Sequence, residues 1–147
     1  MPALPLVLWL PQVRATLVDA RSKRARFLTA VVHQLDLSER VQVVEARIEE
    51  VIDEYRNQDV VTARSFGPPS ATLEIASGLL MVGGSALIAE PPGGRLWAAH
   101  GLERLGVVQR SAPGASVAVF ERVGSTPPPR RWKHMIESPV VEVRVRN

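Results

Sequence analysis

The sequence contains no cysteine. Without thiols the chain can form no disulfide framework and can offer no thiolate nucleophile. This absence suits a reducing compartment, and we expect a cytoplasmic protein. No apolar run approaches the roughly 20 residues of a membrane-spanning helix. The apolar start MPALPLVLWL has neither the positive residues nor the cleavage site of a signal peptide.

Several catalytic signatures are missing as well. The histidines His33, His100 and His134 are scattered, and no group of residues has metal-ligand spacing. No phosphate-binding loop of the P-loop type is present. We therefore expect no metal site, and no residue stands out as a catalytic base or nucleophile.

Charge is unevenly distributed along a chain whose net charge is only +3. Residues 14–26 hold five cations and one acid, residues 45–59 hold six acids and two cations, and residues 121–147 hold six cations and three acids. The basic segments are suited to a polyanion such as RNA. The alternative is ordinary solvated surface.

Short apolar runs alternate with segments of helical period. With 147 residues, 46% of them hydrophobic, the chain is long enough for one domain with a core. The pattern predicts strands at 15–18, 41–45, 60–63, 85–89, 107–110 and 116–122, and helices at 21–37, 48–55, 70–80 and 96–105. This order predicts an α/β fold, a mostly parallel sheet with helices on both faces. We expect a domain over residues 1–124 and a basic, proline-containing tail over residues 125–147 that carries a possible edge strand with Val141, Val143 and Val145 on one side.

Individual residues are assigned to boundaries and to the core. Ser70 is a candidate helix cap, and Gly83-Gly84 is expected to end the connection to the next strand. Trp9 and Trp97 lie in apolar runs and are expected in the core. Trp132 lies among cations, so it either stacks on a base or packs against the domain. The segment EPPGGR, residues 90–95, is interpreted as a loop.

Charged residues follow the predicted strands, where α/β sheets bind their ligands. Asp19 follows the first strand and either accepts hydrogen bonds from ribose hydroxyls or caps the next helix. Glu49 follows the second and either accepts from an adenine amino group or complements a helix dipole. Arg64 ends the third strand, where it either serves a ligand or pairs with a nearby acid.

These residues carry a resemblance to a known family. The segments LPLVLWLPQVRATLVDARSKRARFL, ARIEE and DVVTARSFGPP resemble the RsmG (GidB) family over residues 1 to about 87. Members of that family methylate guanine N7 in 16S ribosomal RNA, the small-subunit RNA. The resemblance implies a Rossmann-like class I methyltransferase fold, S-adenosylmethionine as cofactor and small-subunit ribosomal RNA as partner. It places Asp19, Ile48, Glu49 and Arg64 at the cofactor site.

The chain also departs from the family pattern. Met1, Pro2 and Ala3 match the end of the family's glycine-rich loop, so the first strand is missing. We expect an N-terminally truncated domain that binds the cofactor weakly or not at all. Its exposed sheet edges predict self-association or a marginally stable fold. The family's Lys-Gly after the fifth strand is replaced by Glu90, Pro91 and Pro92. Two alternatives stay open: an RNA-associated remnant without catalysis, and a methyltransferase for another substrate.

Overall fold

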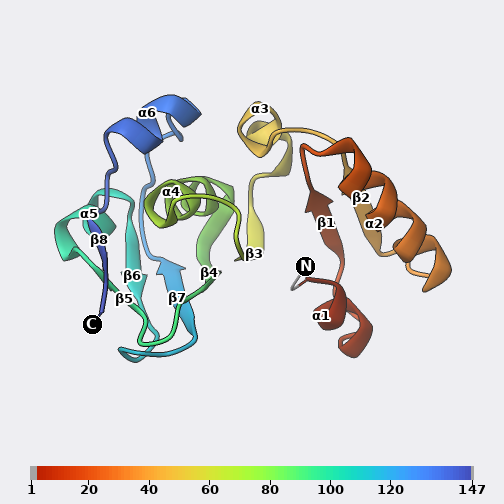
Figure 1. The fold of residues 1–147 in the computed structure, drawn as a ribbon, viewed down its shortest axis with the longest axis horizontal. Helices are drawn as coiled ribbons and strands as arrows, with labels where there is room; N and C mark the ends of the chain where they lie inside the picture. The colour runs from red at the N-terminus through yellow and green to blue at the C-terminus, as the bar shows by residue number, and fades with distance from the viewer. Residues whose placement is uncertain (1–2, 147) are drawn as a thin grey trace. The chain divides into compact units, whose positions relative to one another are not determined.

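The structure is a computed structural model that describes residues 3–146, and it divides into two compact units, residues 1–51 and 52–147 (Figure 1). Each unit contains its own hydrophobic core. Met1 and Pro2, where the resemblance to the glycine-rich loop begins, lie outside the described residues, as does Asn147.

The first unit is built on two parallel strands, β1 (Ala15–Val18) and β2 (Val41–Val44). The helix α2 (Ser22–Gln34) connects them and buries Ala25, Leu28 and Val32, which are spaced three and four residues apart and so share one helical face. The short helices α1 (Ala3–Trp9) and α3 (Ile48–Val51) complete the unit. The predicted strands and helix of this segment are confirmed, within a few residues at their ends.

Helix α1 ends against the guanidinium of Arg40. The Nη1 atom of Arg40 lies 3.0–3.2 Å from four carbonyl oxygens, those of Val7, Leu10, Pro11 and Val13. A cation suits this place because the last carbonyls of a helix have no partner within it. The core prediction for Trp9 is wrong, since 85% of this residue is exposed. Val7 is the buried residue of α1, and two residues further the helix has turned by about 200°, so Trp9 points away.

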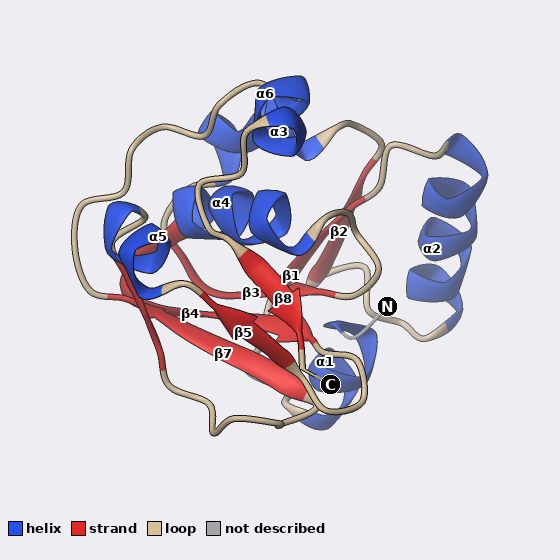
Figure 2. Cartoon of the chain, turned by 60° about the vertical axis from the view of Figure 1, so that its left-hand side comes forward, coloured by secondary structure: helices blue, strands red, loops and turns tan. Residues whose placement is uncertain are grey.

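The second unit contains a four-stranded sheet of order β3-β4-β7-β6. Its strands are β3 (Gln58–Ala63), β4 (Leu80–Ala89), β6 (Val107–Gln109) and β7 (Val117–Arg122). The pairing of β3 with β4 is parallel, and β7 pairs antiparallel with both β4 and β6. Therefore β3, β4 and β6 run in one direction and β7 alone runs in the other. Figure 2 shows these strands in red, with the helices in blue.

The connection from helix to strand before β4 differs from the prediction. β4 begins at Leu80, directly after α4 (Pro69–Leu79), so Gly83 and Gly84 lie inside the strand instead of in a loop. The β3–β4 register shifts at this place, between Gln58 and Val60. A side chain at Gly84 would meet the carbonyl oxygen of Gln58 at 2.8 Å, so the glycine permits the close approach of β3.

The predicted helix at 96–105 is partly wrong. Residues 95–97 form the strand β5 (Arg95–Trp97), which pairs antiparallel with β8 (Val143–Val145), and only Ala99–Arg104 is helical, as α5. Trp97 is buried as predicted. Its ring packs edge-on against that of Phe120, with the ring centroids 4.7 Å apart. Pairing with β8 and packing against Phe120 thus outweigh the local helical pattern.

The described part of the tail, residues 125–146, belongs to the second unit, and its helix packs against α4. Every residue of α4 from Ser70 to Leu79 is buried, including Glu74. Ser70 does not cap the helix, and its Oγ instead accepts a hydrogen bond of 3.1 Å from the backbone N–H of Val141. The tail contains a helix that was not predicted, α6 (Trp132–Glu137). The predicted edge strand forms as β8 over Val143–Val145, whereas Val141, which was expected in it, lies before the strand and is fully buried.

Glu74 is the charged residue inside α4, and Arg130 of the tail neutralises it. The carboxylate of Glu74 accepts three hydrogen bonds from Arg130: from the backbone N–H at 3.0 Å, from Nε at 3.0 Å and from Nη2 at 2.8 Å. The side-chain hydrogen bonds to Glu74, and then its negative charge, raise the pKa of Arg130, and burial opposes this rise. The pair joins α4 to the proline-rich connector.

Candidate functional site

Asp19 lies directly after β1, at the carboxyl end of the two-stranded sheet. Its backbone N–H donates to the carbonyl of Val44 at 3.1 Å, which extends the pairing of β1 with β2. One carboxylate oxygen accepts from the N–H of Arg21 at 2.8 Å, one residue before α2 begins. The other lies 3.7 Å from Nη1 of Arg24. The carboxylate thus supports the start of α2 and keeps one oxygen for a further donor.

Ile48 and Glu49 open α3, at the same end of the β1–β2 sheet. Ile48 is buried, with 8% of the residue exposed. Glu49 lies in the first turn of α3, as the alternative interpretation expected, and its carboxylate is 3.7 Å from Nη1 of Arg47. At this distance Glu49 accepts no hydrogen bond from Arg47, so its oxygens remain acceptors. The first unit therefore contains Asp19, Ile48 and Glu49, three of the four predicted site residues, in the segments that follow β1 and β2.

Arg64 belongs to the second unit, where it follows β3. Ala63 pairs with Ile88, so Arg64 and Glu90 leave their strands at the same edge of the sheet. Arg64 is exposed, and its side chain makes no hydrogen bond or ion pair with any residue among 3–146. The alternative that Arg64 forms a structural ion pair thus has no partner in the described part of the chain.

The turn after Arg64 is shaped by an unusual backbone and by Trp132. Ser65 has a φ of 51°, a left-handed conformation that non-glycine residues adopt infrequently. The rings of Phe66 and Trp132 pack edge-on, with their centroids 5.6 Å apart. A side chain at Gly67 would meet the same ring at 2.7 Å, so glycine allows the tryptophan to approach the turn. Trp132 therefore packs against the domain, which is the second of the two predicted roles.

A pocket of about 250 Å³ opens at this edge of the sheet, entirely within the second unit. Its volume lies just below the roughly 300–1,000 Å³ of pockets that hold drug-sized ligands. Three of the residues that line it are charged: Arg64, Glu90 and Arg95. Glu90 is almost completely buried, with 3% of its side chain exposed, so the pocket presents mainly cations to a ligand.

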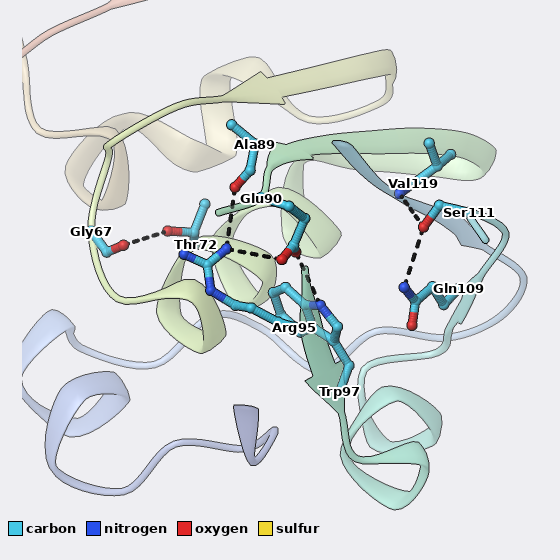
Figure 3. A network of polar contacts seen from close by, with 9 residues as sticks. All are labelled: Gly67, Thr72, Ala89, Glu90, Arg95, Trp97, Gln109, Ser111 and Val119. Carbon is cyan, nitrogen blue, oxygen red and sulfur yellow. Dashed lines mark hydrogen bonds and ion pairs between the residues drawn. The ribbon is translucent and has the colours of Figure 1, made fainter. Parts of the chain in front are cut away.

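Glu90 and Arg95 form a small polar cluster with Trp97 at the wall of this pocket (Figure 3). Glu90 accepts a hydrogen bond from Nε1 of Trp97 at 3.1 Å through Oε1. Its other oxygen lies 3.3 Å from Nη1 of Arg95 but accepts no well-aligned hydrogen bond. The same Nη1 donates to the carbonyl of Ala89 at 3.2 Å. The loop interpretation of residues 90–95 missed this cluster.

Two further features of the described residues concern function. No three histidine, cysteine or acidic side chains among them gather closely enough to hold a metal ion. None of the helices in this part of the chain has the length and apolar character to cross a membrane.

Comparison with known proteins identifies the family. The family model GidB, described as rRNA small subunit methyltransferase G, matches residues 1–90. The chain belongs to this family. The match includes Asp19, Ile48, Glu49 and Arg64, and it ends at Glu90.

Curated GidB relatives named ribosomal RNA small subunit methyltransferase G show the same relationship. The protein of Leuconostoc citreum is 41% identical over 90 residues, 59% of this chain and 37% of the relative. The protein of Chloroflexus aggregans is 40% identical over 89 residues, 58% of this chain and 37% of the relative. The chain therefore spans about two fifths of the length of the curated relatives it matches.

Solved structures agree on the fold of this GidB chain. A methyltransferase from Geobacter sulfurreducens superposes with a TM-score of 0.57 at 14% identity, over 75% of this chain and 58% of its own. An O-methyltransferase family protein from Burkholderia thailandensis superposes with a TM-score of 0.57 at 19% identity. The superposition covers 82% of this chain and 47% of that protein's chain. The prediction of a Rossmann-like class I methyltransferase fold is confirmed.

Proposed function

We propose that this chain is part of an S-adenosylmethionine-dependent methyltransferase that acts in the cytoplasm on guanine N7 of small-subunit ribosomal RNA. The observation that carries the proposal is the GidB match over residues 1–90, because it includes the acids that follow β1 and β2 and the arginine that follows β3. The relatives are named as methyltransferases of small-subunit ribosomal RNA, which supports RNA as the substrate. The family resemblance supports guanine N7 as the atom that is methylated.

The acids of the first unit suit the nucleoside part of this cofactor. The free oxygen of Asp19 can accept a hydrogen bond from a ribose hydroxyl, and the carboxylate of Glu49 can accept from the adenine amino group. Ile48 is the apolar neighbour of Glu49 at the start of α3. Arg64 has an unused planar fork of N–H groups, which matches a carboxylate through two hydrogen bonds.

The chemistry asks little of acid–base groups. S-Adenosylmethionine supplies a methyl group that is already activated on a sulfonium. Guanine N7 has a free lone pair, so no proton has to leave before the methyl is transferred. The protein's task is to hold the two reactants in line, and such positioning can contribute about 7–11 kcal/mol to lowering the barrier. This agrees with a chain that shows no obvious base or nucleophile.

A second candidate function is methyl transfer to a different substrate. It is favoured by Glu90 and Pro91, which stand where the resembled family has Lys-Gly and which line the pocket. A carboxylate in place of a lysine reverses the local charge, and specificity follows from such changes in a binding pocket.

The proposal is tested by transfer of radioactive methyl from S-adenosylmethionine to small-subunit ribosomal RNA. We expect the label on guanine, and RNA cleavage by aniline after borohydride reduction locates a methyl on N7. Label in a protein or in a small molecule, with none in the RNA, favours the second candidate. No transfer to any of these contradicts a catalytic role for the chain.

Arg64→Lys tests the proposed role of Arg64 in binding the cofactor. Equilibrium dialysis with labelled S-adenosylmethionine, extended to millimolar concentrations, should show a loss of affinity of about tenfold or more, because lysine lacks the planar fork. The melting temperature should stay nearly unchanged, since Arg64 contacts no acid in the described chain. Arg104→Lys is the matched control, because Arg104 is also exposed and lies on α5. Equal losses in both variants contradict the assignment.

A further inference from the structure

Arg95 is the second guanidinium of the pocket, and it lies beyond residues 1–90, which the family model matches. Its side chain is mostly buried, with 21% exposed. Only Nη1 is engaged, by the carbonyl of Ala89 at 3.2 Å and by the nearby carboxylate of Glu90. Neither Nε nor Nη2 of Arg95 donates to any residue among 3–146. A guanidinium has five N–H donors, so three are unused.

The same unit contains a second arginine–glutamate pair in which the glutamate is buried, and its hydrogen bonds differ from those of Glu90 and Arg95. Glu74 takes Nε and Nη2 of Arg130, at 3.0 Å and 2.8 Å, so the fork of that arginine is consumed by a structural partner. In Glu90, one carboxylate oxygen accepts a hydrogen bond from Trp97, and the other lies near Nη1 of Arg95. No hydrogen bond joins Glu90 to Nε or Nη2 of Arg95. The fork of Arg95 is therefore oriented by protein groups and is still free for a ligand.

The electrostatics of the pocket favour an anion as that ligand. Arg64 and Arg95 bring two positive charges and Glu90 one negative charge, so the charged lining has a net charge of +1. Because Glu90 is buried, a ligand meets the arginines first. A free arginine fork matches a tetrahedral or planar oxyanion through two parallel hydrogen bonds.

We propose that Arg95 binds a phosphodiester group of the RNA substrate at this pocket, and that Glu90 and the carbonyl of Ala89 hold its guanidinium in place. This inference rests on the proposed function, which makes RNA the substrate and leaves Arg64 for the carboxylate of the cofactor. Arg95 is then a substrate-binding residue, and Glu90 is a positioning residue.

The test measures the affinity of the chain for a fluorescein-labelled single-stranded RNA oligonucleotide over a series of salt concentrations. One phosphate contact contributes about 0.7 to the slope of log affinity against log salt for a single strand. Arg95→Gln should make the slope shallower by about 0.7 and weaken binding several-fold at low salt. Arg104→Gln removes an equal charge at an exposed residue of α5 and should leave the slope unchanged.

Three further measurements complete the test. Arg95→Lys keeps the charge but loses the fork, so it should retain the slope and bind several-fold more weakly; it carries the test if Arg95→Gln does not fold. Glu90→Gln should weaken binding if orientation matters, whereas the added positive charge alone would tighten it. The affinity for S-adenosylhomocysteine should be the same in Arg95→Gln as in the unaltered chain.

The proposal is overturned by an unchanged slope in Arg95→Gln, by an equal change in Arg104→Gln, by tighter RNA binding in Glu90→Gln, or by a loss confined to S-adenosylhomocysteine. The last result would assign Arg95 to a carboxylate of the cofactor. RNA binding is measured without methyl transfer, so the two proposals fail separately. A shallower slope without methylation supports the phosphate site and contradicts the enzyme.

Discussion

Glu74→Gln should destabilise the second unit strongly. The carboxylate of Glu74 is 4% exposed and accepts three hydrogen bonds from Arg130, whose side chain is 35% exposed. Glutamine removes the charge and presents an amide N–H₂ group in place of one acceptor. Removing one partner of a buried ion pair costs about 3–5 kcal/mol. Because Arg130 keeps some contact with water, we expect the lower end, about 3 kcal/mol.

The assay is thermal unfolding followed by circular dichroism. A loss of this size should lower the melting temperature by more than about 10 °C in a unit of this length. The matched control is Glu121→Gln. Glu121 also forms an ion pair, with its Oε2 atom 2.7 Å from Nε of Arg110, but the side chains of Glu121 and Arg110 are 34% and 54% exposed. Exposed pairs contribute less than about 1 kcal/mol, so this variant should melt near the original temperature.

The charge and the packing at this place are separated by a double variant. Arg130→Met combined with Glu74→Leu replaces both charges by apolar groups of similar size, and such exchanges are often neutral or stabilising. The double variant should therefore be more stable than Glu74→Gln. Equal melting of Glu74→Gln and Glu121→Gln would refute the reasoning, because burial would then add nothing to the pair.

Two other predictions concern stability and assembly. Gly78→Ala should destabilise the unit by about 1–3 kcal/mol, because the added methyl group would collide with the ring of Pro129. This loss should outweigh the preference of alanine for a helix. Thermal unfolding checks it, with Gly124→Ala as the control, because a methyl group at Gly124 would have no neighbour within 4 Å. Self-association remains a prediction: β1 pairs only with β2, and β3 only with β4, among the described strands. Sedimentation should detect species larger than the monomer, and Val60→Lys on β3, where half of Val60 is exposed, should reduce them; a single monomeric species at all concentrations contradicts it.

Local sequence patterns were enough to predict most of the segments that form strands and helices, and the order in which these alternate along the chain. The short, largely apolar segments 15–18 and 41–44 form parallel strands, since each is followed by an acidic residue and a helix with an apolar face lies between them. For the same reason Asp19 and Arg64 fell at carboxyl ends, where the fold places ligands. The roles of these residues remain predictions, since they depend on what binds beside them.

Burial of α4 could not be predicted, because it depends on distant residues. A glutamate in the middle of a helix normally marks the exposed face. Glu74 is buried because Arg130 lies 56 positions away in sequence and reaches it from the tail. Pro129 against Gly78, and Val141 against Ser70, are likewise contacts between distant segments. No periodicity within residues 69–79 contains this information.

The polar cluster at the pocket, in contrast, left a local signal. In PPGG the second proline and the first glycine occupy the two central positions of a turn, and Gly93 has a φ of 84°, as the third residue of a type II turn requires. The N–H of Gly94 donates to the carbonyl of Pro91 at 2.9 Å, which closes this turn. The turn returns the chain, so Arg95 comes to lie beside Glu90 at the end of β4. Turn chemistry therefore predicts two opposite charges side by side at the ligand edge of the sheet. It does not predict that the fork of Arg95 stays free, because this depends on Trp97 holding one oxygen of Glu90, and Trp97 is placed by β8, more than 40 residues further along the chain.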